Sequence, residues 1–187
     1  MKILAFIGSP RKNGNLTKII EAICEKPLEE GCDVRLVRLY DANIKGCLNC
    51  KMCKSGEVDL CVQKDMMTEE LIPAIIEADC IIIGTPVYMG HISGVTKVFV
   101  DRWFTFFDNN FRTRHIKGKK LITVTTSMAP AGRYTEVSEY LSKWFIEFFQ
   151  LNLVGKITAG GLEHPGDILK KPEILEQARR LGELLLR

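Results

Sequence analysis

Four cysteines stand close together in the polar segment between residues 40 and 65, and their spacing suits a metal centre. In a tight helical or 3₁₀ winding, residues three apart lie nearly above one another, so three thiolates can point at one centre. A fourth cysteine can return across the following loop to complete the ligand set. The four are Cys47, Cys50, Cys53 and Cys61, in the pattern C-x2-C-x2-C-x7-C.

Three explanations of these cysteines are open. A similar C-x2-C-x2-C run holds iron–sulfur clusters in bacterial ferredoxins, which favours a cluster. A Cys₄ zinc site is the second, although structural zinc sites more often use two separated C-x₂₋₄-C pairs. Thiols that bind no metal, or that oxidise in pairs, are the third. The other cysteines (Cys24, Cys32 and Cys80) fall in or beside predicted helices and strands, and we expect them to be structural.

A second group of polar residues follows the apolar run from Ile3 to Ile7, which predicts a strand buried on both faces. The polar loop 8–15 comes next, and a helical pattern starts at Leu16. A strand, a glycine-bounded loop and a helix together aim backbone N–H groups and a helix N-terminus at an anion. The candidate ligands of that anion are Ser9, Arg11, Asn13 and Asn15.

The loop matches neither the Walker loop nor G-x-G-x-x-G, so the predicted anion is a single terminal phosphate, as on FMN. An ordinary strand-to-helix turn is the alternative. A later loop, 85–94, suits a flat ring, because it offers a proline turn, an aromatic face, a thioether and a glycine. A hairpin-like surface loop with Tyr88 filling a core gap is the alternative there. The ring-contacting residues are predicted to be Pro86, Val87, Tyr88, Met89 and Gly90.

The elements that position these residues alternate between strands and helices. That alternation predicts an α/β fold with a parallel sheet and helices on both faces. Charged or polar residues in the second and fifth strands place them at the edges, which gives the flavodoxin-like order 2-1-3-4-5. The predicted strands are 3–7, 34–39, 80–84, 121–126 and 151–158, and the predicted helices 16–30, 66–78, 95–107, 136–150 and 172–186.

In this order the ligand site lies at the carboxyl ends of the strands, where loops 8–15, 85–94 and 126–134 converge. The cysteine run follows the second strand, so we expect it at the same rim. The whole chain, 1–187, is predicted to be one domain with a cysteine-rich insertion at about 45–63.

Bulk composition excludes several classes of protein. A formal charge of +3 is too small to indicate a nucleic-acid or membrane partner. No apolar stretch is long enough to span a bilayer, and the first residues enter a core strand at once, so we expect no signal peptide and a cytoplasmic location. A basic run between Arg112 and Lys120 is expected to be a solvated loop, or else a docking site for an acidic partner or for the extra phosphate of NADPH.

Taken in order, the 8–15 loop, the cysteine run, Thr85-Pro-Val-Tyr88 and Lys97-x3-Asp101-Arg102 resemble the iron–sulfur flavoproteins, within the wider NADPH-dependent FMN reductase group of flavodoxin-like proteins. The resemblance covers most of residues 1–102. It implies FMN held by the three loops and a 4Fe–4S cluster on the four cysteines. It also implies a homodimer or homotetramer in which the cluster of one subunit lies close to the flavin of another.

The sequence departs from that group at two places. Leu16 stands where many members have Thr, although Thr17 is adjacent and can supply the hydroxyl. The third loop, 126–132, lacks a Gly-Gly pair often seen there, so Ser127 and Gly132 are assigned to the cofactor by position alone.

The resulting hypothesis is an FMN-dependent electron-transfer oxidoreductase whose cluster exchanges electrons with FMN. Its donor is NAD(P)H, ferredoxin or another redox protein, and no side chain is assigned a catalytic role because the cofactors do the chemistry. The alternatives are a cluster-free NAD(P)H-dependent FMN or quinone-type reductase and a non-catalytic redox or flavin sensor.

Overall fold

A parallel sheet lies at the centre of the chain, all 187 residues of which are described by a computed structural model. Its main strands are β1 (Lys2–Ile7), β2 (Asp33–Arg38), β3 (Cys80–Tyr88), β5 (Lys120–Thr126) and β6 (Asn152–Ala159). They pair in parallel in the order β2-β1-β3-β5-β6, so the predicted flavodoxin-like order is confirmed. The sixth strand, β4 (His91–Ile92), pairs antiparallel with the end of β3 alone.

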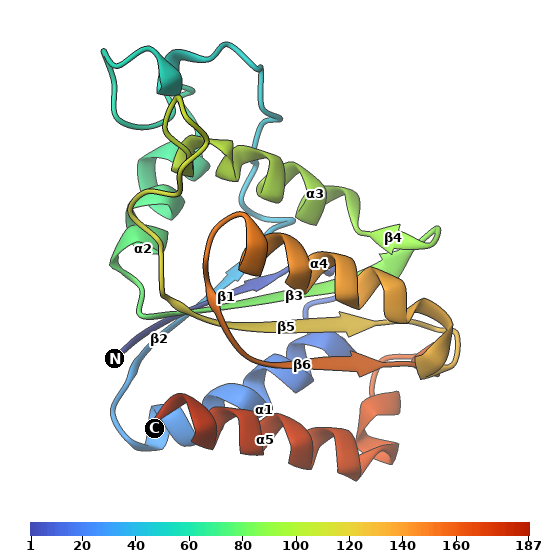
Figure 1. Cartoon of the computed structure of the whole chain (residues 1–187). Coiled ribbons are helices and arrows are strands. Elements are labelled where there is room, and N and C mark those ends of the chain that lie inside the picture. The colour runs from blue at the N-terminus through green and yellow to red at the C-terminus, as the bar shows by residue number, and fades with distance from the viewer.

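Helices cover both faces of this sheet, as Figure 1 shows. Helices α1 (Asn15–Glu29) and α5 (Pro172–Leu185) pack together on one face. The other face is covered by α2 (Ile72–Glu77), α3 (Gly94–Asp101) and α4 (Thr135–Glu147). The predicted three-layer sandwich is therefore confirmed.

Each face of the sheet buries its own apolar core because side chains alternate along a strand. In β3, Ile81 and Ile83 enter the core under α2, α3 and α4, whereas Cys80 and Ile82 enter the core under α1 and α5. Strands β1, β3 and β5 are buried on both faces, which explains their apolar runs. Strands β2 and β6 are partly exposed, as expected of edge strands.

Two predicted helices are less regular than the pattern indicates. The first, 66–78, starts with a π-helical turn, η2 (Met67–Leu71), which runs directly into α2, and Pro73 lies in the first turn of α2. The second, 95–107, is α-helical only to Asp101. It continues as the 3₁₀ helix η3 (Arg102–Phe106).

The prediction of a loop over residues 85–94 is wrong in its first half, because β3 continues to Tyr88. Pro86 pairs with Thr126 of β5, and Val87 and Tyr88 pair with β4 across a tight turn at Met89 and Gly90. Both turn residues have positive φ, of 50° and 75°. The segment is therefore a β3–β4 hairpin, and Tyr88 is 44% exposed instead of filling a core gap.

Short 3₁₀ turns complete the chain: η1 (Met52–Lys54), η4 (Ala131–Tyr134) and η5 (Asp167–Lys170). None of the helices is both long and apolar enough to cross a lipid bilayer.

Candidate functional site

A cavity of about 730 Å³ opens at the carboxyl ends of β1, β3, β5 and β6. That volume lies within the range of about 300–1,000 Å³ typical of small-molecule sites. Nine of the thirteen residues predicted to hold the cofactor line it: Ser9, Arg11, Asn15, Leu16, Pro86, Val87, Tyr88, Met89 and Ser127. The cavity thus joins the first predicted loop to the end of β3 and to the loop after β5.

The N-terminus of α1 forms one end of this cavity. Gly14 is the N-cap residue and supplies no side-chain hydrogen bond, so the first-turn N–H groups keep their positive partial charge. The hydroxyl of Thr17 is buried in this turn and has no hydrogen-bond partner. Ser9 is also buried and accepts a hydrogen bond from the N–H of Arg11 at 3.2 Å. This set of donors fits a phosphate group.

Asn15 and Arg11 are engaged mainly with the chain after β6. The Asn15 side-chain carbonyl accepts hydrogen bonds from the N–H groups of Gly166 and Ile168, and its amide donates to the carbonyl of His164 at 2.9 Å. Arg11 Nη1 donates to the carbonyl of Glu163, also at 2.9 Å. Both residues therefore shape the wall of the cavity, as well as facing into it.

The hairpin end of the cavity offers a flat apolar surface. Pro86, Val87 and Tyr88 present the end of β3, and Met89 is fully exposed at the turn. Partial burial and the neighbouring Tyr40 raise the pKa of Tyr88, so its phenol stays protonated and can donate a hydrogen bond. Such a surface fits an isoalloxazine ring lying across the strand ends.

The four other predicted cofactor residues do not line this cavity: Asn13, Thr17, Gly90 and Gly132. Asn13 is exposed in the first loop, and Gly90 lies in the hairpin turn. The exposed His91 of β4 is also outside the cavity. Its ring lies edge-on to that of Tyr140 of α4, with 5.6 Å between the ring centroids.

Sequence reasoning missed six of the lining residues: Thr126, Met128, Ala129, Tyr134, Leu162 and Glu163. Four of them belong to the third loop, 126–134, in which the sequence predicts only Ser127 and Gly132 as cofactor residues. Leu162 and Glu163 follow β6, and the rule that ligands sit beyond strand carboxyl ends would have included that loop as well.

The four cysteines of the 47–61 run line a second, separate cavity together with Arg102 and Phe104. Cys47 and Cys50 are exposed, and Cys53 and Cys61 are partly buried. No three His, Cys, Asp or Glu side chains in the chain converge closely enough to hold a single metal ion. The space between the four cysteines has a volume of about 20 Å³, close to that of a single water molecule. The donor set of four cysteines around one space is that of a 4Fe–4S cluster.

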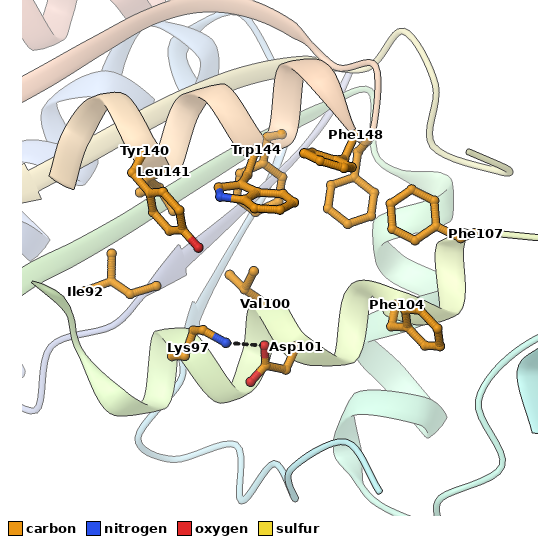
Figure 2. A pocket seen from close by; sticks show the side chains of 12 residues that line it. Ile92, Lys97, Val100, Asp101, Phe104, Phe107, Tyr140, Leu141, Trp144 and Phe148 are labelled. Atoms are coloured by element: carbon orange, nitrogen blue, oxygen red, sulfur yellow. Dashed lines mark hydrogen bonds and ion pairs between the residues drawn. The ribbon is translucent and has the colours of Figure 1, made fainter. Parts of the chain in front are cut away.

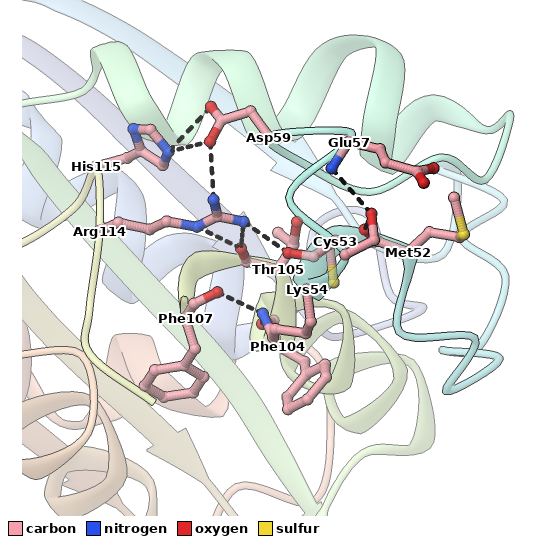
Figure 3. Close-up of polar contacts among 11 residues, drawn as sticks. Met52, Cys53, Lys54, Glu57, Asp59, Phe104, Thr105, Phe107, Arg114 and His115 are labelled. Atoms are coloured by element: carbon pink, nitrogen blue, oxygen red, sulfur yellow. Dashed lines mark hydrogen bonds and ion pairs between the residues drawn. The ribbon is translucent and has the colours of Figure 1, made fainter. Parts of the chain in front are cut away.

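We call residues 45–65 the cysteine loop, and Figure 3 shows how cations attach it to the segment after α3. Lys54 Nζ donates to the carbonyls of Phe104 and Phe107 and lies 4.4 Å above the Phe104 ring. Arg114 Nη2 donates to the carbonyls of Cys53 and Thr105, both at 3.0 Å. The basic run thus supplies an attachment of the loop.

The cysteines were expected at the rim of the first cavity, but the two cavities are separate and share no lining residue. Figure 1 shows the cysteine loop beyond the C-terminal end of α3, whereas the β3–β4 hairpin lies at its N-terminal end. At 1.5 Å per residue, Gly94 and Arg102 are about 12 Å apart along this helix.

Two of the cysteines outside the loop are buried in the core. Burial raises the pKa of Cys24 and of Cys80 to about 12, so both thiols stay protonated.

An apolar groove of about 270 Å³ runs between α3 and α4 (Figure 2). Aromatic side chains of α4 form one wall, where Trp144 and Phe148 stack with ring centroids 4.0 Å apart. They are 38% and 43% exposed. On the opposite wall, Lys97 and Asp101 are paired with each other, so the groove carries no net charge there.

Comparison with known proteins agrees with this geometry. The family model for NADPH-dependent FMN reductase matches residues 1–161. An iron–sulfur flavoprotein of Archaeoglobus fulgidus is 37% identical over 62% of this chain and 55% of its own length. One of Methanosarcina thermophila is 30% identical over 99% of this chain and 95% of its own length. The chain thus spans about half of the first relative and nearly all of the second. An NAD(P)H:quinone oxidoreductase from Methanothermobacter marburgensis has the same fold, with a TM-score of 0.71 and 17% identity over 100% of this chain and 98% of its own.

Proposed function

The chain belongs to the family of NADPH-dependent FMN reductases and iron–sulfur flavoproteins, and from this premise we propose that it is an FMN-dependent oxidoreductase in which a 4Fe–4S cluster exchanges electrons with FMN. The observation that carries the proposal is the cavity at the strand ends, which combines an open α1 N-terminus with the flat end of β3. When bound, FMN supplies hydride and single-electron transfer, and the cluster supplies single-electron transfer.

The side chains and backbone of the chain would bind the two cofactors, orient them and shield them from water. The first turn of α1, the guanidinium of Arg11 and the hydroxyl of Thr17 would hold the phosphate. The backbone of Pro86 to Tyr88 would hold the ring against the strand ends. The cysteine loop would hold the cluster through Cys47, Cys50, Cys53 and Cys61. NAD(P)H or a reduced ferredoxin would supply electrons, and the acceptor would approach the open side of the cavity.

The separation of the two cavities supports a homodimer or homotetramer. Within one chain, α3 lies between the cysteine loop and the hairpin, so a second copy offers a way to place a cluster near a flavin. The groove between α3 and α4 is the surface that supports this association, because it is aromatic, partly exposed and without net charge.

Anaerobic purification followed by cofactor analysis tests the proposal. We expect FMN at about one per chain, together with iron and acid-labile sulfide at about four each. Protein that contains FMN but no iron would contradict the proposed cluster and leave the proposed FMN-dependent activity intact. Failure to bind added FMN would contradict the whole proposal.

A second candidate is a cluster-free NAD(P)H-dependent FMN or quinone-type reductase, which is favoured by the finding that no three of the His, Cys, Asp and Glu side chains converge on one point. The same purification separates the two candidates. Turnover with NADPH by iron-free protein at the rate of the iron-loaded protein would favour the second.

A further inference from the structure

One buried guanidinium closes the base of the cysteine loop. Arg102 begins η3, and its side chain is fully excluded from solvent. Its Nη1 donates hydrogen bonds to the carbonyl of Lys45 at 2.8 Å and to Asp65 at 2.5 Å. Because Lys45 and Asp65 lie at opposite ends of the loop, a single side chain joins the two ends.

The second nitrogen of the same guanidinium reaches a cysteine. Arg102 Nη2 lies 3.4 Å from the Sγ atom of Cys61, and it also contacts the side chains of Asp65 and Thr68. Arg102 lines the cavity that the four cysteines surround. Two other cations lie beside Cys53: Arg114 reaches only its backbone carbonyl, and Lys54 interacts with its thiol while donating to the carbonyls of Phe104 and Phe107.

Stability alone does not explain this arrangement. Burying a charged pair costs about as much free energy as the attraction returns, and apolar replacements of such pairs are often neutral or stabilising. The Nε atom of Arg102 is also buried without a partner. The planar guanidinium of Arg102 binds the Asp65 carboxylate and the Cys61 sulfur at the same time, which a lysine ammonium group cannot do with the same geometry. This arrangement fits a function of Arg102 in holding the Cys61 sulfur.

We propose that Arg102 is a positioning residue of the iron–sulfur site, which fixes the Cys61 ligand by a hydrogen bond to its sulfur and raises the reduction potential of the cluster. Hydrogen bonds to ligand sulfurs and nearby positive charge stabilise the added electron of a reduced cluster. This inference rests on the proposed function, because it requires the cluster to be present.

The test compares Arg102→Lys with Arg114→Lys in anaerobically purified protein. Each substitution keeps a cation, and Arg114 also anchors the loop but contacts no sulfur. Iron content is measured first, and the midpoint potential then by a spectroscopic titration with dithionite. For Arg102→Lys we expect reduction of the cluster to become about tenfold less favourable, which is about 59 mV for one electron. Arg114→Lys should keep the wild-type potential.

A second measurement does not depend on the Arg102 variant. Wild-type protein containing ¹⁵N-guanidinium arginine is reduced and examined by electron–nuclear double resonance. We expect a coupling between the cluster and a guanidinium ¹⁵N nucleus, and the same coupling in Arg114→Lys, because Arg102 is the arginine that contacts a cysteine sulfur. Its absence from an iron-loaded wild type, or equal potentials in wild type and Arg102→Lys, would overturn the role of Arg102 and leave the proposed function intact. A wild type without iron would instead overturn the proposed cluster and this inference with it.

Discussion

The side chain of Asn15 and the backbone of Gly166 are joined by a hydrogen bond of 3.0 Å, although 151 residues separate them in the chain. The same carbonyl oxygen also accepts from the N–H of Ile168, which is fully buried. The first turn of α1 therefore holds the segment after β6 in place, and both form walls of the large cavity.

Replacing Asn15 with Ala should destabilise the protein. The buried N–H of Ile168 then lacks an acceptor, which costs about 1–3 kcal/mol. Denaturant unfolding measures the loss, and hydrogen exchange at Gly166 and Ile168 locates it. Asn13→Ala, in the same loop but exposed, serves as the control. Equal stabilities of the two variants would contradict the role of Asn15.

Replacing Thr17 with Val should weaken FMN binding about tenfold. Hydrogen bonds to charged groups contribute about 1.5–3 kcal/mol, and this hydroxyl is buried without a partner in the first turn of α1, directly behind the residues that line the cavity. Titration of FMN fluorescence gives the affinity. The matched control is Thr123→Val, which removes another unpartnered buried hydroxyl from within β5. An unchanged affinity in Thr17→Val would show that the phosphate lies elsewhere.

Removing Asp65 alone should be severely destabilising. Burial by itself raises the pKa of Asp65, but hydrogen bonds from Arg102 and from two backbone N–H groups outweigh it, so the net pKa is lowered. Asp65→Ala leaves a buried, uncompensated guanidinium, with a cost of about 3–5 kcal/mol. The double variant Asp65→Leu/Arg102→Met should recover most of that loss in urea unfolding. A double variant as unstable as Asp65→Ala would rule out the uncompensated charge as the cause.

Introducing a charge into the groove between α3 and α4 should abolish self-association. Phe148→Lys places an ammonium group on the aromatic wall, where a second copy would have to desolvate it. Sedimentation velocity should show smaller species for this variant than for wild type. Leu28→Lys, at an exposed leucine of α1 on the other face of the sheet, should leave the oligomeric state unchanged. Unaltered sedimentation of Phe148→Lys would place the interface elsewhere.

Asp167 should titrate at unusually low pH. The ammonium of Lys170 and the N–H of His164 stabilise its carboxylate and lower its pKa to about 2. Because the folded pKa lies below the ordinary value of about 3.9, the stabilisation is complete above pH 3.9 and is lost as the pH falls through about 2. The ¹³C carboxyl shift measures the titration. Lys170→Met should return the midpoint toward the ordinary value, and an ordinary midpoint in wild type would contradict the contact.

The amino-acid sequence was sufficient to predict the fold and the edge of the sheet at which the cavity opens. Strands buried on both faces need continuous apolar runs, so β1, β3 and β5 are visible in the sequence, and the charged residues of β2 identify an edge. Once the strand order is known, the topology places the site beyond the strand carboxyl ends.

The position of the cysteine loop and the contacts that attach it could not be predicted from the sequence. The contacts of Arg102 with Cys61 and of Arg114 with Cys53 join residues 41 and 61 positions apart. A local pattern records propensity and periodicity, whereas such contacts depend on how separate segments pack. The same holds for residues 85–88, which are predicted as a loop but fold as strand. Their hydrogen-bonding partners on β4 and β5 are brought to them only when the sheet forms.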